Sequence, residues 1–441
     1  MARSLGRAVV VLGLLALAPT AWSDDTGTAV AAADSGDDRV RARDDRIQDL
    51  ERKVGVLVEE ISRLRTQVAV PDEPELKSRY GLGPAASKVY GVERGLSIGG
   101  YGEANYRNQL GSEGTDRADA LRFVSYIGYK FTEKLIMNAE IEFEHGSTGS
   151  TASSGGGSAS IEFMALDFLH NDKLNARAGL VLVPMGFINE VHEPPSFYGV
   201  FRPETERRII PTTWRELGAG IFGNLTEDLQ YRAYVVNGFN AAGFSSSGIR
   251  GGRQKGNRAL AESLAFVGRM DWTPGDDWLL GGSFYVGNSG QDQGGIPDLQ
   301  LIMWDLHAQY DNGPWHARAL FAMNHLDEAG SLSRALETSS SSPVAEQMLG
   351  GYAELAYDVW PLLFDREDKF LAPFVRLEYV DTQNQVPSGF SRNGLRRFWL
   401  TTAGLQYKPH PNVVLKAEYR YYDPQDGTIP QELSLGMGFA F

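Results

Sequence analysis

The sequence predicts an all-β fold: a sixteen-stranded antiparallel transmembrane β-barrel with an N-terminal coiled-coil helix. Three observations predict the barrel. Apolar and polar residues alternate with a period of two through most of residues 96–441, short and long connections follow one another in turn, and the last alternating segment ends on Phe441. Strands of a membrane barrel face lipid and a wet lumen alternately, so this pattern is the one they carry.

Composition narrows the class of protein. The 441 residues carry a net charge of −14, which argues against a nucleic-acid partner. Cysteine is absent, and the seven histidines show no metal-ligand spacing. No HExxH, GxSxG or P-loop motif occurs, so we expect no enzyme, no metal and no cofactor. His192 lies beside Glu190 and Glu193, and we interpret these three as solvated loop residues.

The first residues indicate secretion. Arg3 and Arg7 precede an apolar run over 8–18, and the small residues Ala21 and Ser23 fit a signal peptidase site. The run is shorter than the roughly 18 residues that a membrane-spanning helix needs, so a signal peptide over 1–23 is favoured over a membrane anchor. Residues 24–38 are predicted to be a flexible linker.

A heptad repeat follows over 39–69. Its a positions are β-branched and its d positions are leucine: Val40, Ile47, Val54, Ile61 and Val68, with Leu50, Leu57 and Leu64. This pattern predicts a parallel coiled coil, with trimer and dimer both open, and a lone amphipathic surface helix is the alternative. Pro71 and Pro74 end the helix. Residues 70–95 are predicted to be a linker before the barrel over 96–441.

The clearest alternating segment is 137–144, where Asn138, Glu140, Glu142 and Glu144 share one face. A dry core would not accept three stacked carboxylates, so this face should meet water. Short turns such as 132–134 alternate with longer polar stretches such as 146–159. Sixteen candidate strands can be counted, at 96–106, 120–131, 136–145, 160–169, 174–183, 214–223, 229–237, 263–272, 278–287, 299–310, 315–323, 347–358, 370–381, 396–408, 413–422 and 431–441.

Aromatic residues mark one expected membrane interface. Tyr129, Phe131, Trp272 and Trp315 flank short turns, as the members of an aromatic girdle would. The final segment, 433–441, alternates apolar residues and ends on an aromatic carboxyl terminus. It resembles the terminal strand that the outer-membrane barrel assembly machinery recognises, and we expect that machinery and outer-membrane lipid as partners.

The connection after the fifth strand, about 184–213, is the predicted functional segment. It is dense in proline, aromatic and charged residues, which favours an ordered loop. Apolar anchors and charges that can stay wet suit a loop folded into the barrel, and an ordered external loop is the alternative. The predicted pore constriction comprises its charged residues Glu190, His192, Glu193, Arg202, Glu204, Glu206, Arg207 and Arg208.

Residues 179–223 resemble the phosphate-selective porin O/P family of bacterial outer-membrane porins. The resemblance rests on Val183–Phe187, His192–Pro195, Ile210–Glu216 and Gly218–Gly220, together with the order of coiled coil and barrel over about 40–441. It implies a trimeric sixteen-stranded porin whose third external loop narrows the channel. The loop after the fifth strand is the third long one.

Alternation places the remaining predicted site residues on the inner wall: Arg122, Glu140, Glu142, Glu144, Arg177, Arg232, Arg269, Arg318, Arg376, Glu378, Lys416, Glu418 and Arg420. With Lys130, Glu103, Asp271, Asp305, Glu354 and Glu432 added, nine basic residues stand against ten acidic ones. The resemblance implies a ladder of basic residues instead, so this balance argues against a phosphate-specific filter.

We therefore predict a homotrimeric outer-membrane porin with its coiled coil in the periplasm. Small polar or ionic solutes, with anions such as phosphate among the candidates, would diffuse through a water-filled channel narrowed by the loop. A receptor or adhesin barrel acting through external loops is the alternative. One finer hypothesis is that Glu190, Glu193, Glu204 and Glu206 oppose basic wall residues, among them Arg122 and Arg177. Another is that Ala417→Arg impairs folding whereas Glu418→Arg does not.

Overall fold

The computed structural model describes residue 43 and residues 46–60, 76–111, 114–151, 155–364 and 369–441. The chain divides into two units, Met1–Glu73 and Pro74–Phe441. The predicted signal peptide and the linker over 24–38 lie outside the described residues. No helix among the described residues is long and apolar enough to cross a membrane.

In the first unit, residues 46–60 are helical. The seam residues Ile47, Leu50, Val54 and Leu57 are 43–59% exposed in the single chain. The other four seam positions, Val40, Ile61, Leu64 and Val68, lie outside the described residues. A helix that exposes such a stripe has its apolar face unpartnered within one chain, and the coiled coil stays a prediction.

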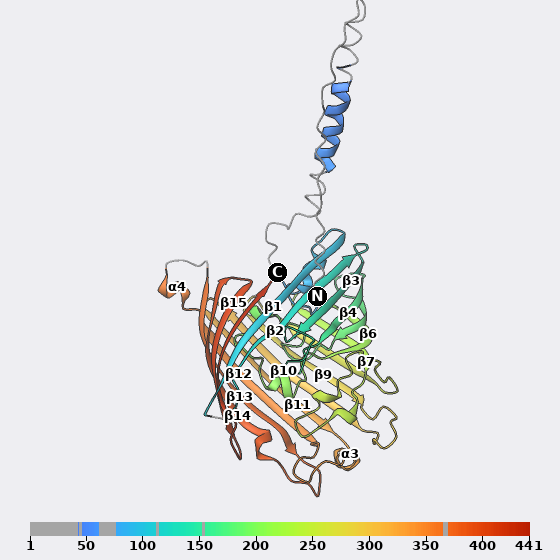
Figure 1. The fold of residues 1–441 in the computed structure, drawn as a ribbon. Helices are drawn as coiled ribbons and strands as arrows, with labels where there is room; N and C mark the ends of the chain where they lie inside the picture. Colours follow the sequence, from blue (N-terminus) through green and yellow to red (C-terminus); the bar gives the residue numbers. More distant parts are fainter. Residues whose placement is uncertain (1–42, 44–45, 61–75, 112–113, 152–154, 365–368) are drawn as a thin grey trace, which may run out of the picture. The chain divides into compact units, whose positions relative to one another are not determined.

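The second unit is a closed antiparallel β-barrel in which each strand pairs with its sequence neighbours and β1 pairs with β16 (Figure 1). Closure leaves no strand edge unpaired, which is the condition for a sheet to cross a bilayer. The predicted fold class is confirmed for the barrel, and each predicted strand matches an observed one. The strands are β1 Gly95–Leu110, β2 Arg117–Lys130, β3 Leu135–Glu144, β4 Ala159–Leu169, β5 Asn175–Leu182, β6 Arg215–Asn224, β7 Leu229–Asn237, β8 Leu264–Trp272, β9 Trp278–Asn288, β10 Gln300–Asn312, β11 Trp315–Leu326, β12 Gln347–Tyr357, β13 Phe370–Gln385, β14 Arg397–His410, β15 Val413–Pro424 and β16 Gln431–Ala440.

The two faces of the barrel follow the alternation of the sequence. On β15, Leu415 and Tyr419 are 46% and 37% exposed on the outside, whereas Lys416 and Glu418 between them are buried inside. Trp272 and Trp315 are exposed beside the short turns, at 49% and 48%. The apolar side chains therefore face where lipid would lie, and the charged ones face the lumen.

Short turns and long loops lie at opposite ends of the barrel. The β12–β13 connection is a long exception at the turn end, and it contains α4 Trp360–Leu363. At the loop end, Phe239, Ile249, Leu332 and Val344 are buried, so these loops fold over the lumen. The remaining helices are η1 Ala86–Tyr90, η2 Pro194–Ser196, α2 Thr205–Arg208, η3 Ala241–Gly243, η4 Arg250–Gly252, α3 Ala329–Ala335 and η5 Gly394–Arg396.

The described part of the expected linker, residues 76–94, is instead a folded segment. Leu82, Val89 and Tyr90 of this segment are buried against the inner faces of β2–β4. The Arg177 guanidinium donates to the Tyr80 carbonyl oxygen at 3.2 Å, which fixes the segment to β5. Its glycines and proline indicate a linker in isolation, but its apolar residues become buried once a lumen surrounds them.

Candidate functional site

The loop between β5 and β6 lies inside the barrel and is held by side chains of distant strands. The Gly186 backbone N–H donates to Asp305 of β10 at 3.2 Å. The Val200 N–H donates to Glu418 of β15 at 2.8 Å, and the Thr205 N–H donates to Glu378 of β13 at 3.2 Å. Backbone donors inside a barrel need such acceptors because water reaches few of them.

Basic wall residues hold the loop by its carbonyl oxygens. Lys416 Nζ donates to the carbonyl oxygens of Phe197 at 2.7 Å and Gly199 at 2.9 Å. Lys408 Nζ donates to the Pro195 carbonyl oxygen at 2.9 Å. These ammonium groups therefore anchor the loop, and their charges are partly used by the backbone.

Apolar residues of the same loop form a dry cluster against the wall. Met185, Ile188 and Trp214 are fully buried. The Trp214 ring packs 4.7 Å, between centroids, from Phe239 of the next long loop. Burying these side chains stabilises the inserted position at about 25 cal/mol per Å² of apolar surface.

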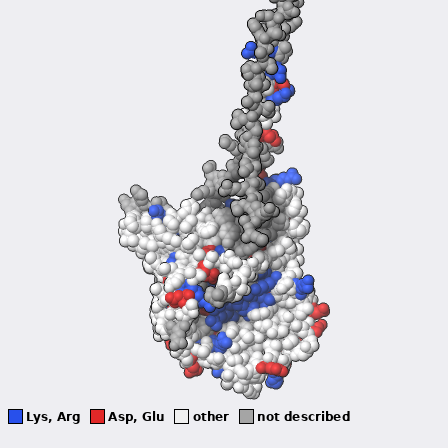
Figure 2. All heavy atoms as spheres, viewed as in Figure 1, with Lys and Arg blue, Asp and Glu red and all other residues white. Residues whose placement is uncertain are grey.

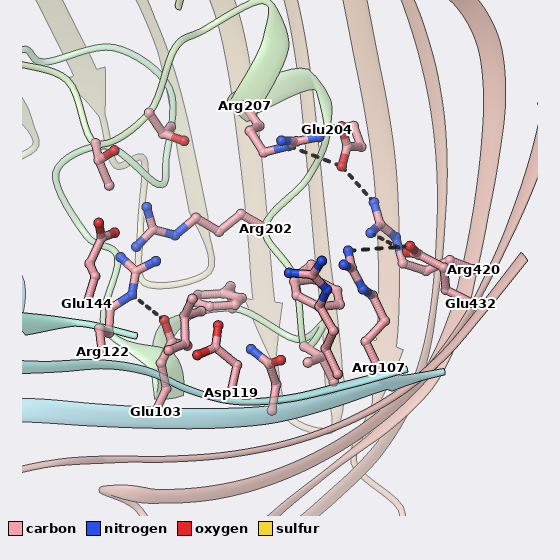
Figure 3. A pocket seen from close by; sticks show the side chains of 18 of the residues that line it. Glu103, Arg107, Asp119, Arg122, Glu144, Arg202, Glu204, Arg207, Arg420 and Glu432 are labelled. Atoms are coloured by element: carbon pink, nitrogen blue, oxygen red, sulfur yellow. Dashed lines mark hydrogen bonds and ion pairs between the residues drawn. The ribbon is translucent and has the colours of Figure 1, made fainter. Parts of the chain in front are cut away.

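Beside the loop lies a cavity of about 580 Å³. Figure 3 shows charged side chains from β1, β2, β15, β16 and the loop pointing into it. Its charged lining consists of eight arginines, five carboxylates and His145: Arg107, Arg117, Arg122, Arg202, Arg207, Arg208, Arg250, Arg420, Glu103, Asp119, Glu144, Glu204 and Glu432. Lys and Arg also gather in one band on the face shown in Figure 2.

Ion pairs take up part of this positive charge. Arg122 contacts Glu103 at 2.7 Å. Arg420 contacts Glu204 at 2.9 Å and Glu432 at 3.0 Å. Glu204 also accepts from Arg207 at 2.8 Å and Arg208 at 2.6 Å, so three arginines share one carboxylate.

Three arginines of the lining, Arg117, Arg202 and Arg250, form no ion pair with any described carboxylate, and of these Arg202 and Arg250 are half-buried whereas Arg117 is exposed. Arg202 has a buried Nη2 atom without a hydrogen-bond partner among the described residues. Arg250 donates only to the Thr212 carbonyl oxygen and, at 3.3 Å, to Thr213 Oγ1. Burial first, and then neighbouring Arg253, lower the pKa of Arg250 to about 9. An unmatched buried cation is costly, so the cavity has room for negative charge.

The eight predicted constriction residues separate into two groups. Arg202, Glu204, Arg207 and Arg208 line the cavity. The others are buried in contacts that hold the loop, so the interpretation of Glu190, His192 and Glu193 as solvated residues was wrong. Glu190 contacts Arg232 at 3.2 Å and Arg269 at 3.7 Å, and Glu193 accepts from the Ala85 N–H at 2.9 Å. Glu206 accepts from the Ile188 N–H and the Tyr352 hydroxyl, both at 2.7 Å. His192 lies against Glu140 and Glu162.

The predicted wall residues all lie on the inner face. Glu190 and Glu204 do contact basic wall residues, Arg232, Arg269 and Arg420, but the two arginines named in the hypothesis have other partners. Arg122 and Arg177 do not pair with the loop carboxylates: Arg177 binds Asp167 at 2.7 Å. Other wall residues pair along the wall or bind the loop backbone: Arg376 contacts Glu354 and Glu378 at 3.0 and 2.8 Å, Arg318 donates to Gln309 at 2.9 Å, and Arg232 and Arg269 both contact Asp271. Glu142 contacts Arg122 at 3.2 Å, and Glu144 lines the cavity.

The hypothesis that Glu418→Arg is harmless was wrong in its premise. Glu418 is buried, accepts from the Val200 N–H, and lies with Arg376 and Arg420 around it. An arginine there would meet two guanidinium groups and leave the Val200 donor unpaired.

Sequence reasoning missed Arg107, Arg117, Asp119 and Arg250 of the cavity. β1 and β2 extend farther toward the loop end than predicted, to Leu110 and from Arg117. Continuing the alternation of Glu103 and Asn105 by one step would have found Arg107. Arg250 could not be found in this way, because it reaches the cavity from η4 in a long loop.

Known proteins resemble this chain at two levels. The family model described as "Putative beta-barrel porin-2, OmpL-like" matches residues 218–436. An uncharacterized protein of Aquifex aeolicus (strain VF5) is 38% identical over 379 residues, which cover 83% of this chain and 85% of that protein.

Solved structures share the fold at low sequence identity. A loop-deletion mutant of OmpT, an outer membrane protein of Vibrio cholerae, matches with TM-score 0.51 and 12% identity over 79% of this chain and 100% of that chain. Salmonella typhi OmpF in complex with daunomycin matches with TM-score 0.50 and 13% identity over 79% and 98% of the two chains. The outer membrane channel DcaP of Acinetobacter baumannii gives TM-score 0.50 and 13% identity over 78% and 97%.

The comparisons match porins without selecting the phosphate-selective O/P group, so that finer resemblance stays a prediction. The closed sixteen-stranded barrel agrees with the family match. The matched family model describes porins, and the solved structures share the barrel fold. The chain belongs to the same family as the Aquifex aeolicus protein, and the porin family model matches residues 218–436 of this chain.

Proposed function

We propose that this porin passes small anions by diffusion, through an arginine-lined cavity narrowed by the loop between β5 and β6. The observation that carries the proposal is the lining of the cavity, where eight arginines stand against five carboxylates. This excess contrasts with the balance of nine basic and ten acidic residues expected from the wall alone. The loop and the strand ends add the arginines that change the sign.

The arginine excess acts where water is confined. Charges around a narrow wet passage raise the local concentration of counter-ions more than the same charges on an open surface. Guanidinium groups also present several donors that suit carboxylates and phosphates. Arg202 and Arg250, which lack a carboxylate partner among the described residues, are the groups best placed to attract an anion.

Purified protein in planar lipid bilayers tests the proposal. The zero-current potential in a tenfold salt gradient should show anion preference, and the double variant Arg202→Gln/Arg250→Gln should reduce it. Arg334→Gln, on the exposed outer helix α3, is the matched control and should leave the potential unchanged. Cation preference of the native channel would contradict the proposal. Absence of conductance would favour a receptor or adhesin instead.

The same protein is proposed to assemble as a homotrimer through parallel coiled coils in the periplasm. The exposed stripe of Ile47, Leu50, Val54 and Leu57 supports this, because it would be covered by equivalent helices of other copies. Samples are heated to increasing temperatures and then run on a gel. Deleting 39–69 should lower the temperature at which the oligomer dissociates, while the barrel still folds. Deleting 24–38 is the control. An oligomer of unchanged heat resistance without 39–69 would exclude the coiled coil as an assembly element.

Insertion is proposed to depend on the last strand. The backbone of Phe441 exchanges two hydrogen bonds with Gly100, each 2.9 Å, and its ring is 42% exposed on the outside. The end of the chain thus closes the barrel and still presents an aromatic ring for the assembly machinery. Phe441→Ala should reduce the folded amount in the outer membrane more than it reduces refolding into detergent. Equal losses in both would argue against recognition of this ring.

A further inference from the structure

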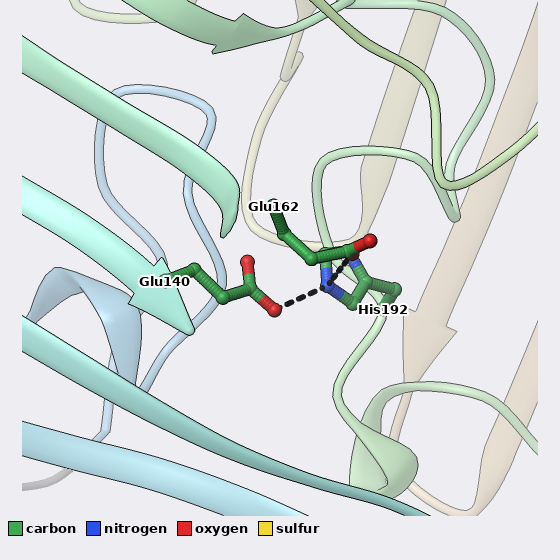
Figure 4. Close-up of side chains that lie close together, drawn as sticks. All are labelled: Glu140, Glu162 and His192. Carbon is green, nitrogen blue, oxygen red and sulfur yellow. Dashed lines mark hydrogen bonds and ion pairs between the residues drawn. The ribbon is translucent and has the colours of Figure 1, made fainter. Parts of the chain in front are cut away.

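A second cluster of charged residues lies away from the cavity lining, between the wall and the inserted loop. It consists of Glu140 on β3, Glu162 on β4 and His192 on the loop, and all three are buried (Figure 4). His192 Nε2 lies 3.2 Å from Glu140 Oε1 and 3.8 Å from Glu162 Oε2. One ligand atom of each residue lies within 4.8 Å of the other two.

The surroundings of His192 orient its free electron pair toward the two carboxylates. Its Nδ1 lies 3.2 Å from the carbonyl oxygen of Asn189, which can only accept, so Nδ1 carries the proton. The Asn189 side chain is itself held by hydrogen bonds to Val183 and Trp214 at 2.7–2.8 Å. In the neutral ring Nε2 is then an acceptor. Three acceptors converge with no donor between them.

Two carboxylate oxygens of the cluster lack partners. Glu140 Oε2 and Glu162 Oε2 are buried without a hydrogen bond to any described residue. The other oxygen of Glu162 contacts Arg215 at 2.5 Å. Of the two, Glu162 Oε2 faces His192 Nε2 directly, and Glu140 Oε2 belongs to the carboxylate whose other oxygen faces that nitrogen. Buried polar atoms are almost always paired, so these unpartnered oxygens beside an imidazole nitrogen indicate that a positively charged group belongs there.

The charged residues around the cluster indicate how much positive charge it lacks. Three carboxylates in this region form ion pairs with two guanidinium groups: Glu103 and Glu142 with Arg122, and Glu162 with Arg215. Glu140, the fourth carboxylate, contacts His192 instead. Arg202 faces the region from the loop but forms no ion pair with these described residues. Four carboxylates therefore stand against two paired guanidinium groups and the nearby Arg202, so the region keeps an excess of negative charge that a bound cation would offset.

We propose that Glu140, Glu162 and His192 bind one divalent transition-metal ion of the zinc class, which joins the inserted loop to β3 and β4. Zinc takes imidazole and carboxylate ligands at about 2.0–2.2 Å in tetrahedral geometry, which places ligand atoms about 3.4 Å apart. The separations of 3.2 and 3.8 Å from His192 Nε2 bracket that value. The Nδ1 contact with Asn189 is the outer partner that metal-bound histidines usually have.

This site is separate from the proposed anion passage and would act on the position of the loop. β3 and β4 carry two ligands and the loop carries the third, so the metal bridges parts of the chain 52 residues apart. A bound ion would hold the loop against this side of the wall. Metal binding and conductance can therefore be measured independently, and failure of one leaves the other untouched.

The experiment uses full-length protein refolded from urea into detergent, with either Zn²⁺ or EDTA present. After desalting, metal analysis should find about one zinc per chain in the zinc sample. Zinc should also raise the midpoint of thermal unfolding. Cobalt(II) in place of zinc should give visible absorption of a four-coordinate ion, a measurement that requires no variant. Absence of stoichiometric zinc and of the cobalt signal would overturn the proposal in favour of a shared proton.

Variants locate the site. His192→Ala and Glu162→Gln should each reduce bound zinc at least tenfold. His307→Ala is the matched control, because His307 is also buried in the lumen but shares Asp271 with Arg269. Zinc bound equally by all variants would place the ion elsewhere, and equal binding of Mg²⁺ by the native protein would exclude the zinc class. Both outcomes contradict the proposal.

Discussion

Two stretches of the inserted loop lie in opposite surroundings. Residues 185–193 are almost wholly buried, whereas most of 201–208, namely Phe201, Arg202, Glu204, Arg207 and Arg208, line the cavity. The same contrast separates Glu204 and Glu206, which are two residues apart at the start of α2. Glu204 lines the cavity and contacts Arg207, Arg208 and Arg420, whereas Glu206 lies on the dry side and accepts from the Ile188 N–H and the Tyr352 hydroxyl.

A charged residue can therefore belong to a loop inside the pore without facing the water of the pore. Glu206 binds neutral donors, so its contacts hold the loop in shape. Glu204 is surrounded by cations, so its charge adjusts the field of the cavity. The sequence treats the two alike, and the following experiments separate them.

The largest effect is expected from Glu206→Ala. It leaves the Ile188 N–H and the Tyr352 hydroxyl buried without an acceptor, and each such loss costs about 1–3 kcal/mol. The free energy of unfolding, measured by urea titration in detergent micelles, should fall accordingly. Glu206→Gln keeps one acceptor oxygen and should lose less. If Glu206→Ala and the native protein are equally stable, the buried contacts of Glu206 do not hold the loop.

A loss of stability nearly as large as that of Glu206→Ala is expected when a charged side chain is placed in lipid instead of water. Ala417→Arg puts a guanidinium on the outer face, which costs about 2–4 kcal/mol near the bilayer midplane. Asn105 lines the cavity, so Asn105→Arg places the same charge in water and serves as the control. It replaces Glu418→Arg because Glu418 is buried near Arg376 and Arg420 and accepts from the Val200 N–H. Folding yield into lipid vesicles is the measurement. If both variants fold equally well, the inside and outside faces of the barrel have been assigned incorrectly.

A smaller effect, on selectivity alone, is expected from Glu204→Gln. Removing this carboxylate frees part of the charge of three arginines, so the zero-current potential should move toward anion preference. Glu206→Gln should leave the potential unchanged, although the sequence-based hypothesis grouped the two residues. Glu328→Gln, before the outer helix α3, is a distant control. A shift of the same size with Glu206→Gln would show that the two sides of α2 are not distinct.

The smallest effect concerns pH. Burial alone would raise the pKa of Glu204, but Arg207, Arg420 and Arg208 hold it well below its ordinary value. Glu204 should thus stay ionised at pH 4.5, where an ordinary glutamate of pKa about 4.3 is partly protonated. The difference in zero-current potential between the native channel and Glu204→Gln should persist from pH 7 to pH 4.5. Its disappearance at pH 4.5 would mean that the three arginines do not control this carboxylate.

The sequence by itself determined the barrel. Strand positions, the inner and outer faces, and the order of short and long connections all follow from alternation along the chain. That alternation is a local property, because successive side chains of a strand point to opposite sides whatever the strand packs against. The apolar spacing of the first unit likewise predicts a helix, and residues 46–60 are helical.

Only the tertiary structure decided which charges meet. Arg420 reaches Glu204 across 216 residues, and Glu193 accepts from the Ala85 N–H across 108 residues, within a segment that the sequence presents as a linker. Alternation shows that a side chain points inward but not what faces it across the lumen. The partners depend on how one loop crosses the barrel, and burial then separates a structural carboxylate from one that borders the cavity.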